Sequence, residues 1–396
     1  MQTRRKFIEQ SALLSLTPWI PDFIPQSLGA TPASPDDRIL VVIQMDGGND
    51  GLNTVIPFKD SRYAEVRKEL RIPEKDILKL NAEIGLHPGM KGMFELFQEG
   101  RMSIIQGVGF PNPNRSHFES MSIWQHASLE STQHDSLGWL GRTADTWYPK
   151  SANGPDSVYV GSESIPIALR GRRSEAISLH EESDLVLKTA VTERTPPQKT
   201  DDDVKSYVQR SLASSFESSR RFAESKKSLL SASIQYPASA LAKKLHLISR
   251  MIRVGGGARV YYVTQPGYDT HSAQLYPHQQ LLREFSQAVK ALLDDLKQAN
   301  LDQQVAVMAY SEFGRRVQEN GSAGTDHGVA GPMFFAGGAL QAGIVGGHPS
   351  LTDLDDGDLK VAIDFRQVYS TVLTKWLGIA SNVIGTQSDC LSLFRI

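Results

Sequence analysis

The most constraining feature of the sequence is segment 38–45 (RILVVIQM), a nearly continuous run of apolar and β-branched side chains. A strand covered by helices on both faces has no positions that face solvent, so its sequence is continuously apolar instead of alternating. The run therefore predicts a strand in the centre of a parallel sheet. Similar runs occupy residues 102–107, 259–264, 305–310 and 333–336.

The residues between these runs have the spacing of amphipathic helices. The clearest case is 281–296, where leucine, valine and phenylalanine return every three or four positions. Strands that alternate with such helices predict an α/β fold with a doubly wound, mostly parallel sheet and helices on both faces. The chain has 396 residues, of which 40% are hydrophobic, so it can build a core of that size.

Residues 151–236 differ from the rest of the chain in composition. They contain two clusters of basic residues, the polar segment 195–203 (TPPQKTDDD) and a helical pattern rich in serine, lysine and glutamate. We interpret this stretch as an insertion that covers one edge of the sheet. On this interpretation residues 38–396 form a single α/β domain.

The first 33 residues have the layout of a twin-arginine signal peptide. Arg4 and Arg5 precede a short apolar run at 11–20, and small residues follow near Ala30 and Ala33. The apolar run is too short to span a membrane as a helix, which takes about 20 residues. We expect the twin-arginine translocation machinery to export the protein to the periplasm or the extracellular space, without a transmembrane segment in the mature protein. The alternative is a basic, frayed N-terminal helix.

The cysteine content bears on where the protein folds, and the net charge bears on the class of partner that it binds. The single cysteine, Cys390, cannot form an internal disulfide, and a protein that folds in the reducing cytoplasm before transport needs none. The formal net charge of -2 and the pI near 6.6 lack the basic excess that nucleic-acid-binding proteins carry. We therefore expect no nucleic-acid partner.

Polar clusters adjoin the predicted strands. Segment 46–51 (DGGNDG) follows the first run and 112–117 (NPNRSH) follows the second. Segments 269–271 (DTH) and 311–315 (SEFGR) follow the third and fourth runs, and 324–328 (GTDHG) precedes the last. Ligands of open α/β sheets bind beyond the carboxyl ends of the strands, so we expect these clusters to converge there.

The clusters supply the carboxylates and imidazoles that bind a divalent metal such as zinc, manganese, iron or calcium, and they contain no cysteine for a structural thiolate site. A metal would lower the pKa of bound water or polarise a phosphoryl or sulfuryl oxygen. The sequence leaves the number of ions open. The candidate ligands are Asp46, Asp269, His271, Glu312, Asp326 and His327.

Each cluster also has a purely structural interpretation. The glycine-rich segment 46–51 would be only a turn. Ser116 and Glu119 form the Ser-x-x-Glu pattern of a capping box, whereas the functional alternative directs the same hydroxyl into a site that favours anions. Glu312 and the nearby Arg315 would form surface salt bridges.

Taken together, six ordered motifs resemble the bacterial family known as domain of unknown function 1501. The resemblance extends from about residue 38 to about residue 377. That family is placed in the alkaline phosphatase and sulfatase superfamily, so the resemblance implies an alkaline-phosphatase-like core. The motifs are segments 42–51 (VIQMDGGNDG), 114–117 (NRSH), 268–271 (YDTH), 311–316 (SEFGRR), 324–328 (GTDHG) and 364–366 (DFR).

The resemblance also implies roles for individual residues. Asp46 takes the position of the first metal ligand, Asp269 and His271 that of a ligand pair, His327 that of the last ligand, and Ser116 that of the nucleophile. The chain departs from the superfamily where Ser311-Glu312 replaces an adjacent Asp-His.

The leading hypothesis is an exported, metal-dependent hydrolase that acts on the phosphate or sulfate ester of a small molecule or a glycan. Ser116, Arg115 and His117 are its predicted catalytic residues, with Arg115 binding the oxygens of the ester. The alternative is a non-catalytic exported binding protein on the same scaffold. It is motivated by Ser311-Glu312, which stands where the superfamily has an adjacent Asp-His.

Overall fold

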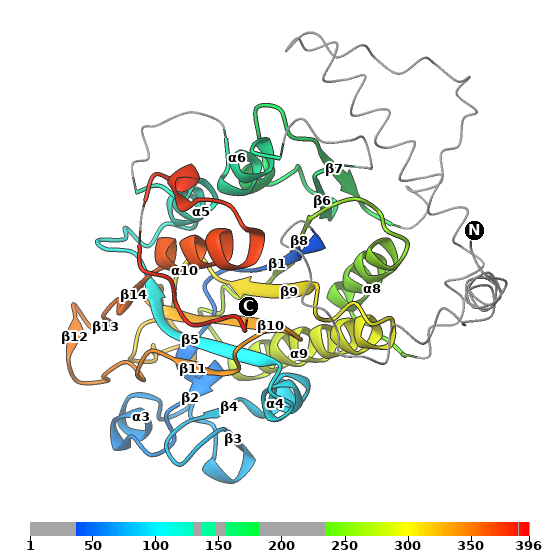
Figure 1. Cartoon of the computed structure of the whole chain (residues 1–396). Helices are drawn as coiled ribbons and strands as arrows, with labels where there is room; N and C mark the ends of the chain where they lie inside the picture. The colour runs from blue at the N-terminus through cyan, green and yellow to red at the C-terminus, as the bar shows by residue number, and fades with distance from the viewer. Residues whose placement is uncertain (1–36, 130–136, 148–154, 182–233, 387, 396) are drawn as a thin grey trace, which may run out of the picture. The chain divides into compact units, whose positions relative to one another are not determined.

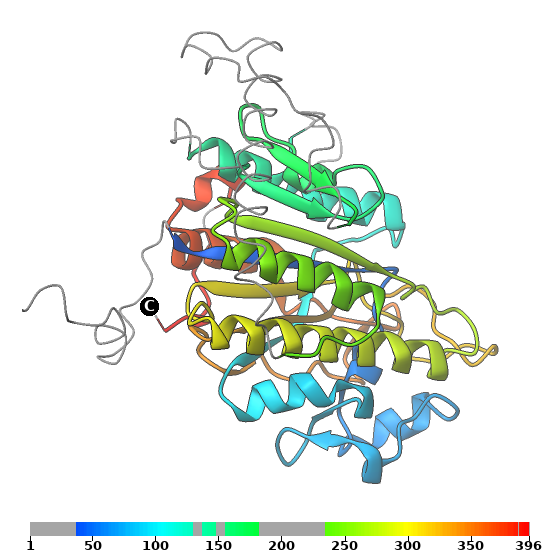
Figure 2. The ribbon, with the colours of Figure 1, turned by 90° about the vertical axis from the view of Figure 1, so that its right-hand side faces the viewer.

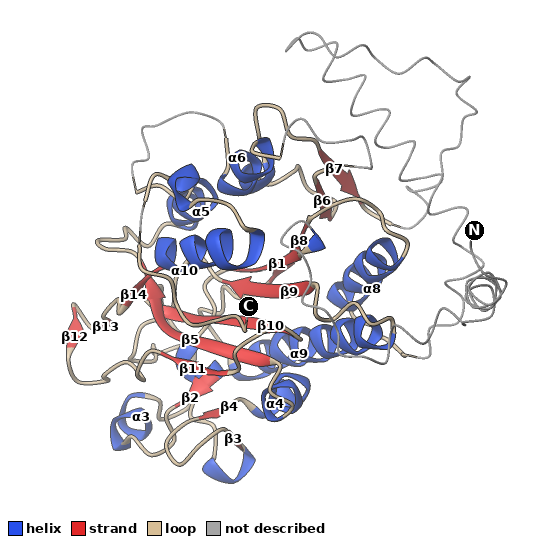
Figure 3. Ribbon diagram, viewed as in Figure 1, coloured by secondary structure: helices blue, strands red, loops and turns tan. Residues whose placement is uncertain are grey.

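The computed structural model describes residues 37–129, 137–147, 155–181, 234–386 and 388–395. The predicted signal peptide and residues 182–233 of the predicted insertion lie outside this description. Within the described part, helices lie on both faces of a central sheet (Figures 1 and 3). This arrangement confirms the predicted fold class, a doubly wound, mostly parallel α/β sheet.

The described part of the chain has one nine-stranded sheet in the order β11-β5-β10-β9-β1-β8-β6-β7, with β14 beside β5. Only the two pairings of β10, with β5 and β9, are antiparallel. The strands are β1 (Ile39–Asp46), β5 (Met102–Gly109), β6 (Ser157–Val160), β7 (Ala176–Leu179), β8 (Val260–Pro266), β9 (Val305–Tyr310), β10 (Gly331–Gly337), β11 (Gly343–Val345) and β14 (Ile363–Asp364).

All five predicted strands are present, and the central one, β1, explains why its sequence is continuously apolar. Val41, Ile43 and Met45 pack into the core on one face of the sheet, and Leu40 and Val42 pack into the core on the other. The predicted strand at 333–336 is β10, which runs against its neighbours. An apolar run indicates burial on both faces but carries no information about strand direction.

Two sets of helices cover the two faces. In Figure 2 the long helices α8 and α9 run along the face turned to the viewer. Together with α4 they pack on one face of the sheet, whereas α5, α6 and α10 pack on the other. The helices are α2 (Gly51–Thr54), α3 (Ser61–Val66), α4 (Lys91–Gln98), α5 (His117–His126), α6 (Trp139–Asp145), α8 (Ala240–Arg253), α9 (Leu275–Gln298) and α10 (Phe365–Thr371).

Smaller elements complete the described part. A three-stranded sheet has the order β2-β4-β3, and β12 pairs with β13 in a hairpin. None of the described helices combines the length and the apolar composition that crossing a membrane requires. The additional strands are β2 (Val55–Ile56), β3 (Leu78–Lys79), β4 (Gly85–Leu86), β12 (Leu354–Asp355) and β13 (Asp358–Leu359).

Strands β6 and β7 fall inside the predicted insertion. They pair in parallel with each other, and β6 pairs with β8, so they extend the main sheet at its edge. This part of the stretch therefore contributes strands to the sheet. The wider prediction of a single domain with an insertion remains a prediction.

Candidate functional site

The strand directions bring the polar clusters to one edge of the sheet. β1, β5, β8 and β9 run in the same direction, so the segments that follow them leave at the same edge. β10 runs the opposite way and begins at that edge, which brings the residues that precede it, Asp326 and His327, to the same place. Because β10 is antiparallel to its neighbours, the residues that precede it lie at the same edge of the sheet as the residues that follow β1, β5, β8 and β9.

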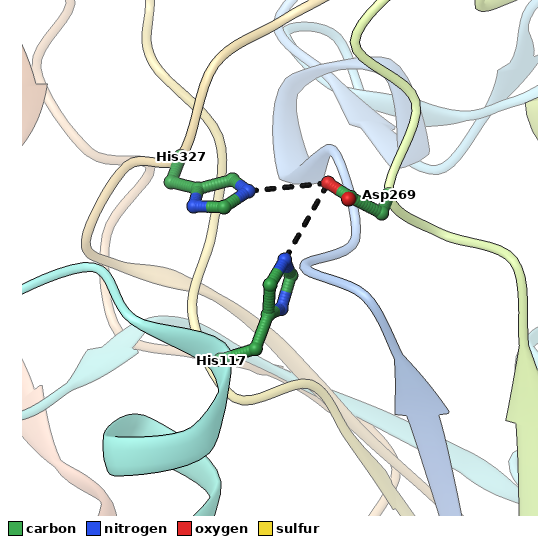
Figure 4. Close-up of side chains that lie close together, drawn as sticks. All are labelled: His117, Asp269 and His327. Atoms are coloured by element: carbon green, nitrogen blue, oxygen red, sulfur yellow. Dashed lines mark hydrogen bonds and ion pairs between the residues drawn. The ribbon is translucent and has the colours of Figure 1, made fainter.

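Three side chains from these segments converge as a possible metal site: His117, Asp269 and His327 (Figure 4). Their ligand atoms all lie within 4.8 Å of one another. The Nε2 atom of His327 is 3.1 Å from Asp269 Oδ1, and the Nε2 atom of His117 is 3.5 Å from the same oxygen. Asp269 is therefore the centre of the group.

A third imidazole joins this centre. The Nε2 atom of His271 lies 3.0 Å from Asp269 Oδ1 and 2.9 Å from the Nε2 atom of His327. His271 and Asp269 are about half-exposed, so the group is open to solvent on one side. The predicted pair Asp269 and His271 is thus brought together with His327 and with His117.

The second nitrogen of each imidazole faces an oxygen that can only accept a hydrogen bond. His117 Nδ1 is 2.7 Å from Glu312 Oε1, and His271 Nδ1 is 3.1 Å from Asp326 Oδ1. His327 Nδ1 is 2.9 Å from the backbone oxygen of Arg115. Each Nδ1 therefore carries a proton as a donor, and each Nε2 atom faces Asp269.

These contacts fit a divalent metal. Atoms that bind one zinc ion at about 2.0–2.1 Å lie roughly 2.9–3.4 Å apart, and the distances around Asp269 Oδ1 are close to this range. The Nε2 atoms of His271 and His327 lie 2.9 Å apart, a contact that is satisfied either by a proton on one of the rings or by a cation that both nitrogens bind. In addition, the buried Nε2 atom of His117 has no hydrogen-bond partner in the described part of the chain.

Glu312 and Asp326, which the sequence predicts as ligands, contact the Nδ1 side of two imidazoles. Glu312 is buried and also accepts a hydrogen bond from the backbone nitrogen of Gly47 at 2.9 Å. Asp326 also accepts a hydrogen bond from Asn320 at 3.1 Å. Carboxylates in such positions fix the tautomer and the orientation of metal-binding imidazoles.

Asp46, at the end of β1, lies beside this group. Its Oδ1 accepts a hydrogen bond from Gln44 at 2.9 Å. Burial raises the pKa of its carboxyl group, and the negative charge of Glu312 adds to the effect. Within the described part of the chain, the Asp46 carboxylate makes no hydrogen bond or ion pair with the three imidazoles, and its role as a ligand stays a prediction.

The buried side chain of Arg315 holds the loops of the site together. Its guanidinium donates to the backbone oxygens of Gly48 at 2.7 Å, Thr325 at 2.7 Å and Tyr268 at 3.1 Å, and to Asp269 Oδ1 at 2.7 Å. Burial alone would raise the pKa of Asp269, but the hydrogen bonds from Arg315 and then from His327 lower it to about 2. Asp269 is therefore ionised at neutral pH.

These contacts correct the interpretation of Glu312 and Arg315 as surface salt bridges. Both side chains are buried, and Arg315 pairs with Asp269 instead of Glu312. Segment 46–51 is likewise more than a turn, because Gly47 has a φ of +119° and an added Cβ would lie 2.4 Å from the backbone nitrogen of Asp269. The glycine allows the loop after β1 to contact the loop after β8.

Ser116 is the N-cap residue of α5, but the predicted capping box is absent. Its side chain makes no capping hydrogen bond, and Glu119 instead contacts the side-chain nitrogen of Asn114. The hydroxyl precedes His117 directly, at the start of a helix. The nearby histidines His87 and His278 lie outside the group: His87 accepts a hydrogen bond from Gly89, and His278 contacts Asn49.

Arg115 contributes its backbone oxygen to His327, while its guanidinium contacts Asp358 and lies 3.2 Å from Asp356. Asp358 was missed by the sequence analysis, because no spacing relates it to Arg115. His117 was predicted as catalytic and lies among the possible ligands. One indication in the sequence was that His117 directly follows Ser116 in a polar segment after a predicted strand.

The family described as "Protein of unknown function (DUF1501)" matches residues 37–384 of this chain, which confirms the predicted family. A search of curated protein sequences found no match.

Several solved structures are similar to the chain at low identity. One is the PsFucS1 sulfatase from Pseudoalteromonas sp., with 11% identity, a TM-score of 0.38 and coverage of 90% of this chain and 73% of that chain. Another is the C-terminal periplasmic domain of EcEptC from Escherichia coli in complex with Zn, with 9% identity, a TM-score of 0.34 and coverage of 76% and 72%. A third is the phosphonate monoester hydrolase SpPMH from Silicibacter pomeroyi, with 8% identity, a TM-score of 0.37 and coverage of 89% and 78%.

Proposed function

The chain belongs to the DUF1501 family, and we propose that it is a metal-dependent hydrolase of phosphate or sulfate esters. One observation carries the proposal: three imidazoles direct their Nε2 atoms toward Asp269 Oδ1 while their Nδ1 atoms face acceptor oxygens. This is the arrangement expected of metal ligands with orienting partners.

The ligands in this proposal are His117, Asp269, His271 and His327, and Glu312 and Asp326 orient two of the imidazoles. Three nitrogen ligands favour zinc, manganese or iron over calcium, which prefers oxygen. When bound, such a metal would supply positive charge that polarises a phosphoryl or sulfuryl oxygen. Asp46, which lies close enough to Glu312 to feel its charge, is a further candidate ligand in this proposal.

Ser116 is the proposed nucleophile. Its hydroxyl makes no capping hydrogen bond, it is next to His117, and it lies at the N-terminus of α5, where backbone N–H groups favour an anion. Attack of Oγ on phosphorus or sulfur would break the ester bond and release the alcohol. Water would then hydrolyse the seryl ester and release phosphate or sulfate.

The variant Ser116→Ala tests this role. We expect it to keep the metal content of the wild type and to lose turnover of an aryl phosphate or aryl sulfate by about 10³-fold or more, because the bond-forming group is gone. Ser122→Ala, on the same helix, is the control and should keep turnover. Full turnover by Ser116→Ala would remove the nucleophile assignment.

The alternative is a non-catalytic binding protein that holds a glycan or a protein partner at the same site. Glu312 favours this alternative. It stands where the superfamily has an adjacent Asp-His, but its carboxylate contacts His117 Nδ1 and the Gly47 nitrogen and so is not free to bind a metal. A screen of phosphate and sulfate esters with zinc, manganese and iron separates the two. Turnover supports the hydrolase, whereas tight binding of the esters without turnover supports the binding protein.

Export by the twin-arginine machinery is a further part of the proposal, and it rests on the sequence of residues 1–33. Replacing both Arg4 and Arg5 with lysine should retain the protein in the cytoplasm, because this pathway requires the arginine pair. Cell fractionation and immunoblotting measure the distribution. The matched control is Lys6→Arg, and equal export of the double variant and this control would contradict the proposed route.

A further inference from the structure

Arg115 connects the candidate metal site with the β12–β13 hairpin. On one side its backbone oxygen accepts the hydrogen bond from His327 Nδ1 at 2.9 Å. On the other side its guanidinium contacts Asp358 Oδ2 and, at 3.2 Å, Asp356 Oδ2. A change in the hairpin can therefore reach a metal-site histidine through a single residue.

The hairpin is a firm anchor for Arg115. Asp356 and Gly357 form its two-residue turn with φ angles of +49° and +82°, which is the type I′ geometry that suits a tight hairpin. The side chain of Leu359 is buried in a hydrophobic cluster with Leu351. Between them, the carboxylate of Asp358 is fully buried.

Arg115 needs such an anchor because its backbone is in an unfavourable conformation. Its φ of +60° lies in the left-handed region, which is unfavourable for a residue with a Cβ. The contact with Asp358 holds the side chain where this backbone conformation can persist. The same conformation directs the Arg115 carbonyl toward His327, immediately before Ser116 and His117 enter the site.

We propose that Asp358 is a positioning residue of the metal site. It acts through Arg115: the ion pair holds the left-handed turn, the turn presents its carbonyl to His327 Nδ1, and this contact keeps a proton on Nδ1 and the Nε2 atom directed at Asp269. The inference rests on the proposed function, because the ring orientation matters only if Nε2 binds a metal. It assigns a role to a residue that lies outside every polar cluster at the strand ends.

The variant Asp358→Asn removes the charge but keeps the shape of the side chain. In the metal-free full-length protein, long-range ¹H–¹⁵N correlation spectra of the imidazole rings should change His327 from one tautomer to a mixture of two. His117 is the internal reference, because its Nδ1 is held by Glu312 at 2.7 Å and its tautomer should stay unchanged. With zinc, the affinity measured against a chromophoric chelator should fall about tenfold, the lower end of the range for partners of ligands.

Asp353→Asn is the matched control. Asp353 is close to the hairpin, and its carboxylate pairs with Lys360 at the surface, where 71% of the Asp353 side chain is exposed. The control should keep the His327 tautomer and the zinc affinity of the wild type.

Two outcomes distinguish failure of this inference from failure of the proposed function. If wild type binds zinc and Asp358→Asn matches Asp353→Asn in both zinc affinity and His327 tautomer, Asp358 has no positioning role. If wild type binds no zinc, manganese or iron, the proposed function fails, and the positioning role fails with it. An Asp358→Asn spectrum in which the His117 tautomer also changes would indicate a general loss of structure and would overturn the specific path through Arg115.

Discussion

Replacing Asp269 with alanine is expected to lower the affinity for zinc by more than about 100-fold, beyond the 10- to 100-fold loss typical for outer partners of a metal site. Asp269 Oδ1 lies within 3.0–3.5 Å of the Nε2 atoms of His117, His271 and His327. Its removal deletes the negatively charged ligand and leaves three neutral imidazoles, which hold a divalent cation less strongly.

The measurement is elemental analysis of protein purified without chelators, followed by zinc titration in competition with a chromophoric chelator. The double variant His271→Ala, His327→Ala should lose metal in the same way, because it removes two of the four proposed ligands. Asp353→Ala, which deletes an exposed carboxylate, should retain the wild-type affinity. If Asp269→Ala binds one equivalent of metal with wild-type affinity, the metal site lies elsewhere in the protein.

The second large effect concerns stability. Arg315→Leu is expected to lower the free energy of unfolding by about 3 kcal/mol or more, because it leaves several buried backbone oxygens without their donor and each such group costs about 1–3 kcal/mol. The guanidinium is completely buried and bonds the backbone oxygens of Gly48, Thr325 and Tyr268 as well as Asp269. Leucine would leave these buried acceptors without their donor, and each such group is costly.

Urea-induced unfolding, monitored by circular dichroism in the presence of a chelator, measures this effect without a contribution from metal binding. Arg316→Leu is the matched control, because the guanidinium of this neighbouring residue is about one-third exposed and contacts Asp356. Its loss should change the free energy of unfolding by about 1 kcal/mol or less. Equal stabilities of the two variants would contradict the role assigned to Arg315.

The two effects have a common cause in the way the site is assembled. The Arg315 guanidinium hydrogen-bonds three segments at once: the loop after β1, the loop after β8 and the segment before β10. Two of these segments contribute proposed ligands: Asp269 and His271 follow β8, and His327 precedes β10. Arg315→Leu is therefore also expected to weaken metal binding, although its primary effect is on folding.

Much of the fold could be predicted from the sequence. The run at 38–45 predicted the central strand because a strand buried on both faces has to be apolar throughout, and the period of three to four in 281–296 predicted the helix that became α9. The polar segments that follow the strands predicted the edge at which a site would form. The direction of β10 was not predictable, since burial on two faces is the same for parallel and antiparallel strands.

The sequence by itself therefore determined the fold class, the family and the set of side chains that could carry chemistry, because these depend on local composition, spacing and motif order. Only the tertiary structure decided which atom faces which: Glu312 and Asp326 contact the Nδ1 atoms of His117 and His271, and Asp269 lies among three Nε2 atoms. His117 and Glu312 are 195 positions apart in the chain. Contacts over such separations arise from the packing of whole loops, and no local pattern in the sequence records them.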